Sequence, residues 1–217
     1  MFEITTALGK KPVSKEERLY TIEEYLEMEE FSQINHEYHN GKLIPMAGGT
    51  PAHSEVKAQL IISLGIAIRA SKQPCRIYNS DIRINLPEIG RVLMPDATVV
   101  AGKPDFTIEK PIGLLANPTL IIEVFSKSSE GYDRGDKFKQ YRTLSSFTEY
   151  MLVSQEKPAV ETFVKKDGQW FINEVAEGLD ASVVLDSIGI TLSLSDIYWG
   201  VGFEEKKPKK SASKKSS

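Results

Sequence analysis

A carboxylate stands in the middle of an almost unbroken apolar run. Residues 120–125 are Leu-Ile-Ile-Glu-Val-Phe, a length and composition typical of a β-strand that is buried on both faces. An ionised Glu123 in such a strand is strongly unfavourable unless a cation pairs with it. The chain must therefore fold so that a metal ion or a basic side chain reaches this strand.

A second acid lies upstream in a similar setting. Asp96 belongs to the strand-like stretch 93–100 and precedes Glu123 by 27 positions, enough for two adjacent strands and the loop between them. The two carboxylates can then converge at one end of a sheet, where their oxygens would suit Mg²⁺ or Mn²⁺. Pairing of Glu123 with an Arg or Lys inside the fold is the alternative, and both interpretations are open at this point.

Length and composition favour one globular domain. The chain has 217 residues, of which 41% are hydrophobic, and one cysteine, Cys75, which excludes an intramolecular disulfide and a cysteine-based zinc cluster. A reducing cytoplasm is the expected location. The N-terminus lacks the pattern of a secretory signal, and the longest apolar stretch, residues 60–70, is too short to span a bilayer, so we expect a soluble protein.

Charge is distributed unevenly along the chain. Residues 206–217 contain six lysines and no acid, and removing those six charges from the net charge of −3 leaves −9 for the rest. An acidic body argues against broad phosphate binding by charge alone, but a local basic groove and acidic metal ligands can coexist with it. We expect an N-terminal arm (1–18), a single domain (19–203) and a disordered lysine-rich tail (204–217).

Local signals in the N-terminal part predict a helix and a hairpin. Thr21 is suited to cap a short helix over residues 20–28. The Asn40-Gly41 pair predicts a β-hairpin over residues 35–46, because both residues tolerate positive φ, and this hairpin places Glu37 on its first strand.

Further along the chain, helices alternate with strands. Pro51 begins a helix that apolar spacing extends to about residue 70, and strands over 76–86 and 91–101 form an expected hairpin. The remaining elements are a loop (103–118), a strand (119–125), a polar turn (126–131), a helix (134–144), a strand (150–153) and C-terminal strands (159–164, 170–175, 182–185). This order predicts a mixed α/β fold: a central mixed sheet flanked by helices, with an N-terminal hairpin and a C-terminal β extension.

An ordered set of short motifs resembles a known family. The set is Pro95-Asp96, Glu123-Val124-Phe125-Ser126, the stretch from Tyr132 to Tyr141, and Glu149-Tyr150-Met151-Leu152-Val153. Over roughly residues 20–200 the chain resembles the Uma2 family (the DUF820 group) of proposed restriction endonucleases within the PD-(D/E)XK nuclease superfamily. The resemblance implies a restriction-endonuclease-like core, metal-dependent cleavage of DNA, and a homodimer.

The chain departs from the superfamily pattern at one position. The lysine expected two residues after the second acid is replaced by Phe125. The resemblance implies that Lys137, on the following helix, supplies it and orients or deprotonates the attacking water, with Lys139 or Lys127 as poorer substitutes. A solvated helical lysine is the alternative interpretation of Lys137.

The resemblance also singles out residues near the N-terminus. It implies that Glu37 is an outer ligand or a second-metal ligand, and that His53 contacts a phosphate or orients Glu37; both also have purely structural interpretations. Arg83 shares a strand face with Asp81 and is a candidate phosphate contact, with a salt bridge as the alternative.

These residues lead to a hypothesis of Mg²⁺-dependent DNA hydrolysis. Asp96, Glu123 and the backbone carbonyl of Val124 would hold Mg²⁺, and Lys137 would position the water. The alternative is a catalytically inactive nuclease-like fold that acts as a nucleic-acid or protein binding module. The sequence contains neither a Gly-x-Ser-x-Gly elbow nor a phosphate-cradling glycine loop, which argues against serine hydrolase, P-loop and dinucleotide-binding functions.

Overall fold

A six-stranded mixed sheet forms the centre of the fold. The computed structural model describes residues 18–108 and 112–203; apart from Arg18, the expected arm and lysine-rich tail lie outside these residues. The strand order is β12-β11-β10-β9-β6-β3, with β9 and β10 parallel and the other neighbours antiparallel. The strands are β3 (Cys75–Asn79), β6 (Ala97–Ala101), β9 (Leu120–Phe125), β10 (Glu149–Ser154), β11 (Ala159–Lys166) and β12 (Gln169–Glu177).

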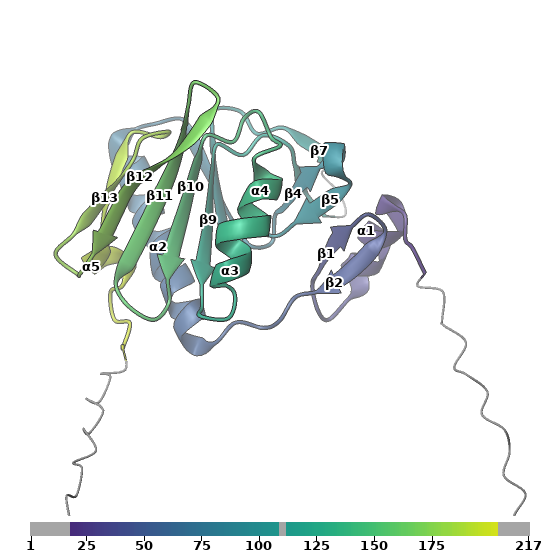
Figure 1. Cartoon of the computed structure of the whole chain (residues 1–217), viewed down its shortest axis with the longest axis horizontal. Coiled ribbons are helices and arrows are strands. Elements are labelled where there is room, and N and C mark those ends of the chain that lie inside the picture. The colour runs from purple at the N-terminus through teal and green to yellow at the C-terminus, as the bar shows by residue number, and fades with distance from the viewer. Residues whose placement is uncertain (1–17, 109–111, 204–217) are drawn as a thin grey trace, which may run out of the picture.

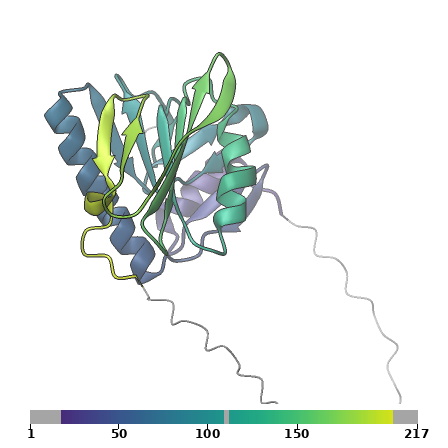
Figure 2. The same ribbon diagram turned by 60° about the vertical axis from the view of Figure 1, so that its left-hand side comes forward.

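Helices cover both faces of this sheet (Figures 1 and 2). On one face lie the long helix α2 (Pro51–Ser71), the hairpin of β13 (Ser182–Leu185) and β14 (Ile190–Ser193), and the short helix α5 (Leu194–Ile197). On the other face lies the helical segment 130–141, which consists of α3 (Glu130–Tyr132), the π-helical turn η2 (Asp133–Lys137) and α4 (Phe138–Tyr141). The expected mixed α/β class, with a mixed sheet flanked by helices, is confirmed.

The two faces of β9 contribute to different hydrophobic clusters because side chains alternate along a strand. Leu120, Ile122 and Val124 pack in the cluster that includes α2, whereas Ile121 packs with the aromatic cluster beneath the helical segment 130–141. Glu123 is the next residue on the side of Ile121. Its side chain therefore points toward the helical segment that carries Lys137.

A second six-stranded sheet lies beside the first, in the order β2-β1-β5-β4-β8-β7. Its strands are β1 (His36–His39), β2 (Lys42–Pro45), β4 (Arg83–Leu86), β5 (Arg91–Leu93), β7 (Phe106–Ile108) and β8 (Leu114–Leu115); η1 (Pro87–Ile89) joins β4 to β5. Helix α1 (Ile22–Phe31) packs near the β1–β2 hairpin. Strands β7 and β8 fall in the stretch predicted to be a loop, so that prediction was wrong in part.

The long predicted hairpin of residues 76–86 and 91–101 is divided between the two sheets. The pairing of the two arms is confirmed, since Arg76 lies opposite Val100 and Asn85 opposite Val92. The prediction of two continuous strands was wrong, because both arms are interrupted, at residues 80–82 and 94–96. Pro95 has no N–H for a sheet ladder, which explains the break before Asp96. The break leaves Asp96 directly before β6, where its carboxylate does not have to pack in the hydrophobic core.

The helical segment begins earlier and ends earlier than predicted. It runs from Glu130 to Tyr141 rather than from Arg134 to Leu144. Ser129 accepts backbone hydrogen bonds at its carbonyl from Tyr132 and Asp133, so the helix begins within the predicted polar turn. The strands predicted as a C-terminal extension were also misplaced in part, because β11 and β12 belong to the central sheet.

Local signals near the N-terminus are borne out. Thr21 caps α1 in a capping box with Glu24, and Asn40 and Gly41 have φ of 50° and 89° at the turn between β1 and β2. Thr50 caps α2, with Pro51 in its first turn. Among the described residues, no helix is long and apolar enough to cross a membrane.

Candidate active site

Strand register brings the two predicted acids together. Strands β6 and β9 are antiparallel, and Ala97 lies opposite Ile122, so Asp96 is adjacent to Glu123 across the pair. The N–H of Val124 donates to Oδ2 of Asp96 over 2.7 Å. Since the N–H and C=O of one residue in an extended strand point to the same edge, the carbonyl of Val124 also lies on the edge that faces Asp96. Two carboxylates and one carbonyl thus converge at this end of the sheet.

Lys137 points into the same place from the helical segment. Its Nζ lies 2.9 Å from Oε1 of Glu123 and donates to the carbonyl of Met94 over 2.9 Å. The same Nζ is 3.8 Å from Oε1 of Glu37. Lys137 and Glu123 are 3% and 2% exposed, so this is a buried ion pair and not a solvated helical lysine. Lys137 thus contacts the second acid from the helical segment, as the resemblance implied. Its catalytic role stays a prediction.

Helix α2 contributes two basic side chains to Asp96. His53 and Lys57 are four residues apart and therefore lie on the same side of the helix. Nε2 of His53 is 3.3 Å from Oδ2 of Asp96, and Nζ of Lys57 is 3.0 Å from Oδ1. His53 therefore contacts Asp96 and not Glu37, and its predicted contact with a phosphate stays a prediction.

Glu37 is 1% exposed and lies next to Lys137 but does not line the pocket. Its Oε1 accepts from the N–H of Met94 over 3.1 Å, and its Oε2 accepts from the hydroxyl of Tyr132 over 3.1 Å and lies 3.3 Å from Nε2 of His39. Both oxygens are therefore engaged by protein groups. The arrangement suits an outer role, in which Glu37 holds Lys137 and Tyr132, better than direct ligation of a second metal.

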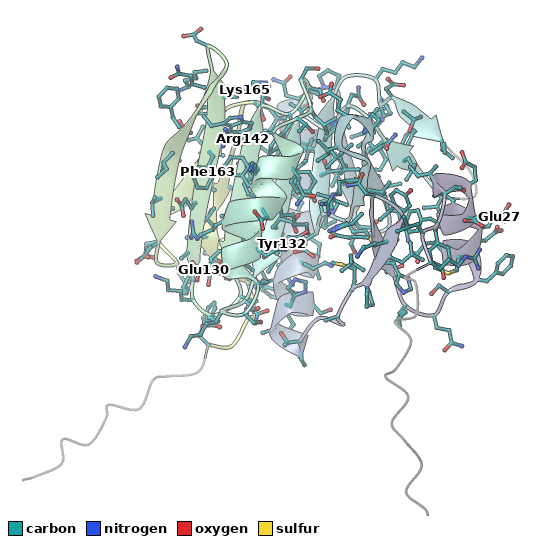
Figure 3. All side chains as sticks on the ribbon, turned by 45° about the vertical axis from the view of Figure 1, so that its right-hand side comes forward. Glu27, Glu130, Tyr132, Arg142, Phe163 and Lys165 are labelled. Atoms are coloured by element: carbon teal, nitrogen blue, oxygen red, sulfur yellow. The ribbon has the colours of Figure 1, made fainter. Side chains whose placement is uncertain are left out.

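A pocket of about 560 Å³ opens onto the two acids. Asp96, Glu123 and Lys137 line its floor, together with His53 and Lys57. Its rim consists of residues 46–50, which lead into the N-terminus of α2, and of serines from the loop that precedes the helical segment 130–141. In Figure 3 the labels of Glu130 and Tyr132 mark this segment and that of Arg142 the residue after its end, whereas Glu27, on α1, lies at the right-hand edge of the view.

Four acids act on Lys137: Glu123, Glu37, Asp133 and Asp96. Burial raises the pKa of Glu123 well above its usual value, and Asp96 and Asp133 raise it further, although Lys137 opposes this. Burial also raises the pKa of Asp133. Burial would lower the pKa of Lys137, but Glu123 and the other surrounding carboxylates outweigh it and raise that pKa. The pKa values of Glu123, Asp133 and Lys137 are thus all shifted upward.

The carboxyl of Asp96 is held ionised. Its burial favours the neutral form, but the hydrogen bond from His53 and the charge of Lys57 outweigh burial and lower its pKa to about 2. Asp96 therefore offers a carboxylate to the pocket at any pH near neutrality.

The residues present fit a divalent cation that keeps part of its water shell. No group of three or more His, Cys, Asp or Glu side chains is arranged to hold a metal within the described part of the chain. Mg²⁺ commonly uses one or two carboxylates and retains several waters, so Asp96 and Glu123 with the Val124 carbonyl are a sufficient donor set. Three acids, Asp96, Glu123 and Asp133, line the pocket, and a cation among them would favour their ionised forms.

Three residues in or beside the pocket were not predicted as site residues. Lys57 lies on an ordinary amphipathic helix, Asp133 directly precedes the predicted helix 134–144, and Tyr141 lies within it. Asp133 is 5% exposed and lines the pocket, and Tyr141 donates to Oε1 of Glu123 over 3.0 Å. The spacing of four residues between Lys137 and Tyr141 was the available signal, since it places both on the side that faces Glu123.

Arg83 is not brought to the pocket. Its Nη2 lies 2.6 Å from Oε2 of Glu29, on α1, with both side chains buried. This is the salt bridge that was the alternative to a phosphate contact, although its partner is Glu29 and not Asp81.

Comparisons with known proteins agree with this geometry. Residues 22–195 match the model of a family named Uma2, described as "Putative restriction endonuclease". Two uncharacterised proteins of Synechocystis sp. are similar in sequence. One, slr1290, is 33% identical over 184 residues, which cover 83% of this chain and 92% of the relative; the other, sll1609, is 34% identical over 159 residues, which cover 73% and 88%.

A solved structure shares the fold. It is a crystal structure of "a putative nuclease belonging to DUF820" from Anabaena variabilis, with a TM-score of 0.62 and 18% sequence identity. The alignment covers 82% of this chain and 97% of that protein. At this level of identity the likeness concerns the fold alone.

Proposed function

Because this chain belongs to the Uma2 family of restriction-endonuclease-like proteins, we propose that it is a Mg²⁺-dependent endonuclease that hydrolyses phosphodiester bonds in DNA. One observation carries the proposal: Lys137 lies 2.9 Å from Glu123, beside Asp96, at the floor of a pocket. Nuclease chemistry requires these groups together, because a phosphodiester must be polarised while a water is aligned for in-line attack.

The acids at the strand ends would hold the metal. Asp96, Glu123 and the Val124 carbonyl are its proposed ligands, and Mn²⁺ would suit the same oxygens. When bound, Mg²⁺ polarises the scissile phosphate and lowers the pKa of a coordinated water. The Val124 N–H fixes Oδ2 of Asp96, so the strand that supplies the carbonyl also orients the carboxylate.

Lys137 would orient the attacking water. An ammonium has three N–H donors, and contacts with Met94 and Glu123 use two of them, which leaves one for a water in the pocket. The raised pKa of Lys137 keeps it protonated, so it acts as a donor and charge stabiliser and does not remove the proton. Glu37 would act through Lys137 by holding its ammonium from behind, as an outer group of the site.

The pocket is suited to an anionic substrate. The N-terminus of α2 lies at its rim and carries a positive end dipole, and His53 and Lys57 add basic groups on the first two turns of that helix. Basic side chains beside a metal-binding pair of acids support a phosphodiester as the substrate. Within the proposal, DNA is that substrate, the protein works in the cytoplasm, and two copies form a homodimer that cuts two strands.

Isosteric substitutions of the two acids test the proposal. Asp96→Asn and Glu123→Gln should each reduce Mg²⁺-dependent cleavage on the order of 10²–10³-fold, while circular dichroism and the unfolding midpoint show a folded protein. Plasmid and single-stranded oligonucleotide substrates would be assayed with Mg²⁺, Mn²⁺ or EDTA. Asp105→Asn and Glu88→Gln are matched controls, because both residues are exposed and outside the pocket. Activity within about threefold of the wild type in either site variant would contradict the assignment.

A second candidate is a nuclease-like binding module without catalysis. Two observations favour it: Lys57 already pairs with Asp96, and no cluster of three metal-binding side chains occurs in residues 18–108 and 112–203. Calorimetry with Mg²⁺ or Mn²⁺ separates the two functions. Saturable binding that Asp96→Asn removes supports the enzyme, whereas no binding at millimolar metal supports the module.

A further inference from the structure

Lys57 contacts the candidate metal ligand from the pocket side. Its Nζ lies 3.0 Å from Oδ1 of Asp96 and donates to Oγ of Ser80 over 3.2 Å. The Lys57 side chain is 25% exposed, in contrast to that of Lys137, which is 4% exposed. Lys57 can therefore move into the pocket without opening the core, whereas Lys137 cannot.

The two oxygens of Asp96 have different partners. Oδ2 accepts from the backbone N–H of Val124 and lies near His53, and these groups are fixed by β9 and by the first turn of α2. Oδ1 is paired with Lys57, at the end of a long flexible side chain. A cation that binds Asp96 while Oδ2 keeps both the Val124 N–H and His53 must use Oδ1. Lys57 and the metal would thus compete for one oxygen.

The ammonium of Lys57 has a second partner besides Asp96. Ser80 also lines the pocket and accepts a hydrogen bond from Nζ that does not depend on the carboxylate. An ammonium held there by a neutral hydroxyl has lost its counter-ion and is free to bind an anion in the pocket. A substrate phosphate would enter the same pocket.

We propose that Lys57 is a displaceable counter-ion of Asp96, which pairs with the carboxylate in the metal-free protein and binds the substrate phosphate once a divalent cation has taken Oδ1. The inference rests on the proposed function, because it requires a metal at Asp96. It assigns Lys57 a role distinct from that of Lys137, which keeps its contacts with Glu123 and Met94 throughout.

Metal affinity tests the first half of the inference. Lys57→Met removes the competing charge and keeps most of the apolar side chain, and it should bind Mn²⁺ about three- to tenfold more tightly than the wild type in calorimetry without DNA. Lys57→Arg keeps a competing charge and should stay near the wild-type affinity. Lys139→Met is the matched control, because Lys139 is exposed on α4 and outside the pocket.

DNA affinity tests the second half. With Ca²⁺ in place of Mg²⁺, and with intact DNA verified on a gel, Lys57→Met should bind a short duplex several-fold more weakly than the wild type, and Lys139→Met should not. In EDTA the difference in DNA affinity between Lys57→Met and the wild type should become smaller, because the Lys57 ammonium is then paired with Asp96. A difference that is equal in Ca²⁺ and EDTA would overturn the phosphate role.

The outcomes separate this inference from the proposed function. Equal Mn²⁺ affinity in the wild type and Lys57→Met would overturn the inference and leave the metal site intact. If neither protein bound Mn²⁺, the proposed function would fail and the inference with it. Binding by Lys57→Met alone would support the inference in its strongest form, with Lys57 as a complete block.

Discussion

Glu29 and Arg83 form one buried ion pair and Glu123 and Lys137 form another, and none of the four residues is more than 6% exposed. Each pair also has a tyrosine hydroxyl beside it, from Tyr25 in the first and Tyr141 in the second. Composition alone does not distinguish them. The pairs differ in the number of acids that surround the basic side chain. They also differ in whether the paired residues line the pocket.

The Glu29–Arg83 pair is closed. Nε of Arg83 donates to the hydroxyl of Tyr25, which donates in turn to the carbonyl of His36, and the N–H of His36 donates to Glu29. These bonds join α1, β1 and β4, and neither Glu29 nor Arg83 lines the pocket. The fork of an arginine suits such a fixed network. The contacts indicate a structural pair.

The Glu123–Lys137 pair is open on one side. Lys137 is influenced by Glu37, Asp96 and Asp133 as well as by Glu123, and both members of the pair line the pocket. Burial raises the pKa of Glu123, Asp96 and Asp133 raise it further, and Lys137 opposes the shift. A buried pair that combines surplus acid with access from solvent is prepared to bind a cation, whereas a balanced and enclosed pair only stabilises the fold.

Breaking the closed pair should have the largest effect on stability. Arg83→Met leaves Glu29 buried with His36 as its remaining basic neighbour, so the free energy of unfolding should fall by about 3–5 kcal/mol. Urea unfolding followed by circular dichroism measures it. Arg76→Met is the matched control on an exposed arginine and should change stability by less than about 0.5 kcal/mol. A loss under about 1 kcal/mol for Arg83→Met would remove the distinction between the two pairs.

Breaking the open pair should reduce stability less and activity more. In Lys137→Met, Glu123 can take up a proton or contact pocket water, so we expect a loss of about 1–3 kcal/mol of unfolding free energy. Cleavage should fall about 10²–10⁴-fold, as for loss of a group that positions the attacking water. The same urea titration and a plasmid assay measure both, with Lys139→Met as control. Wild-type cleavage by a folded Lys137→Met protein would exclude the proposed role.

A divalent cation should act on one pair only. Mn²⁺ that binds the folded state stabilises it by about 2.7 kcal/mol at one hundred times its Kd. Lys137→Met removes the positive charge that would repel a cation at Glu123, so its melting temperature should rise more with Mn²⁺ than that of the wild type. Arg83 does not line the pocket, so Arg83→Met should gain as much as the wild type. An equal gain in all three proteins would show that Lys137 does not influence the metal site.

The same contrast explains what the sequence predicted and what it did not. The apolar run around Glu123 and the spacing to Asp96 were sufficient to predict adjacent strands with converging acids, because register in a buried strand is set by its pattern of side chains. The role of Lys57 had no such signal, since its helix pattern is that of any amphipathic helix. Only the packing of α2 on the sheet brings Lys57 to Asp96.

Boundaries failed where local signals competed with tertiary contacts. The helix that carries Lys137 was predicted to begin at Arg134, but it begins at Glu130 and contains a π-helical turn from Asp133 to Lys137. Such a turn has no propensity signature and often occurs at functional sites. It aims Lys137 at Glu123, so the feature that sequence could not predict is the one that completes the candidate site.

Removing the hydroxyl of Tyr25 or of Tyr141 should have a smaller effect on the free energy of unfolding than breaking the ion pair beside it. Tyr25→Phe leaves Nε of Arg83 and the carbonyl of His36 without the hydroxyl, and should lower the free energy of unfolding by about 2–3 kcal/mol. Tyr141→Phe removes one hydrogen bond to Glu123, but Glu123 keeps its ion pair with Lys137. The free energy of unfolding should therefore fall by about 1 kcal/mol. Parallel urea titrations compare the two variants. A larger loss for Tyr141→Phe would reverse the order of the two networks.

Another buried acid, Glu149, forms no salt bridge within the residues that the structure describes, and its replacement should give the smallest effect. Glu149 is fully buried, and its carboxylate accepts from the N–H and hydroxyl of Ser187 and from the N–H of Asp186. Burial raises its pKa although these hydrogen bonds oppose the shift. The folded state therefore holds this proton more tightly than the unfolded state does, so the contribution of Glu149 to stability is greatest below its ordinary pKa and falls as pH rises through the folded pKa.

Glu149→Gln should therefore flatten the pH dependence of stability. The amide cannot ionise, so the decline in unfolding free energy between about pH 4.5 and neutrality should become shallower than in the wild type. At neutral pH the two proteins should differ by about 1 kcal/mol or less, because the amide gains neutrality but loses part of the hydrogen bonding to Ser187. Urea titrations at pH 5 and pH 7 provide both values. An unchanged slope would contradict this prediction. It would mean that the N–H groups around Glu149 compensate its charge as fully as Arg83 compensates that of Glu29. An acid held by hydrogen bonds alone would then behave like the Glu29–Arg83 ion pair.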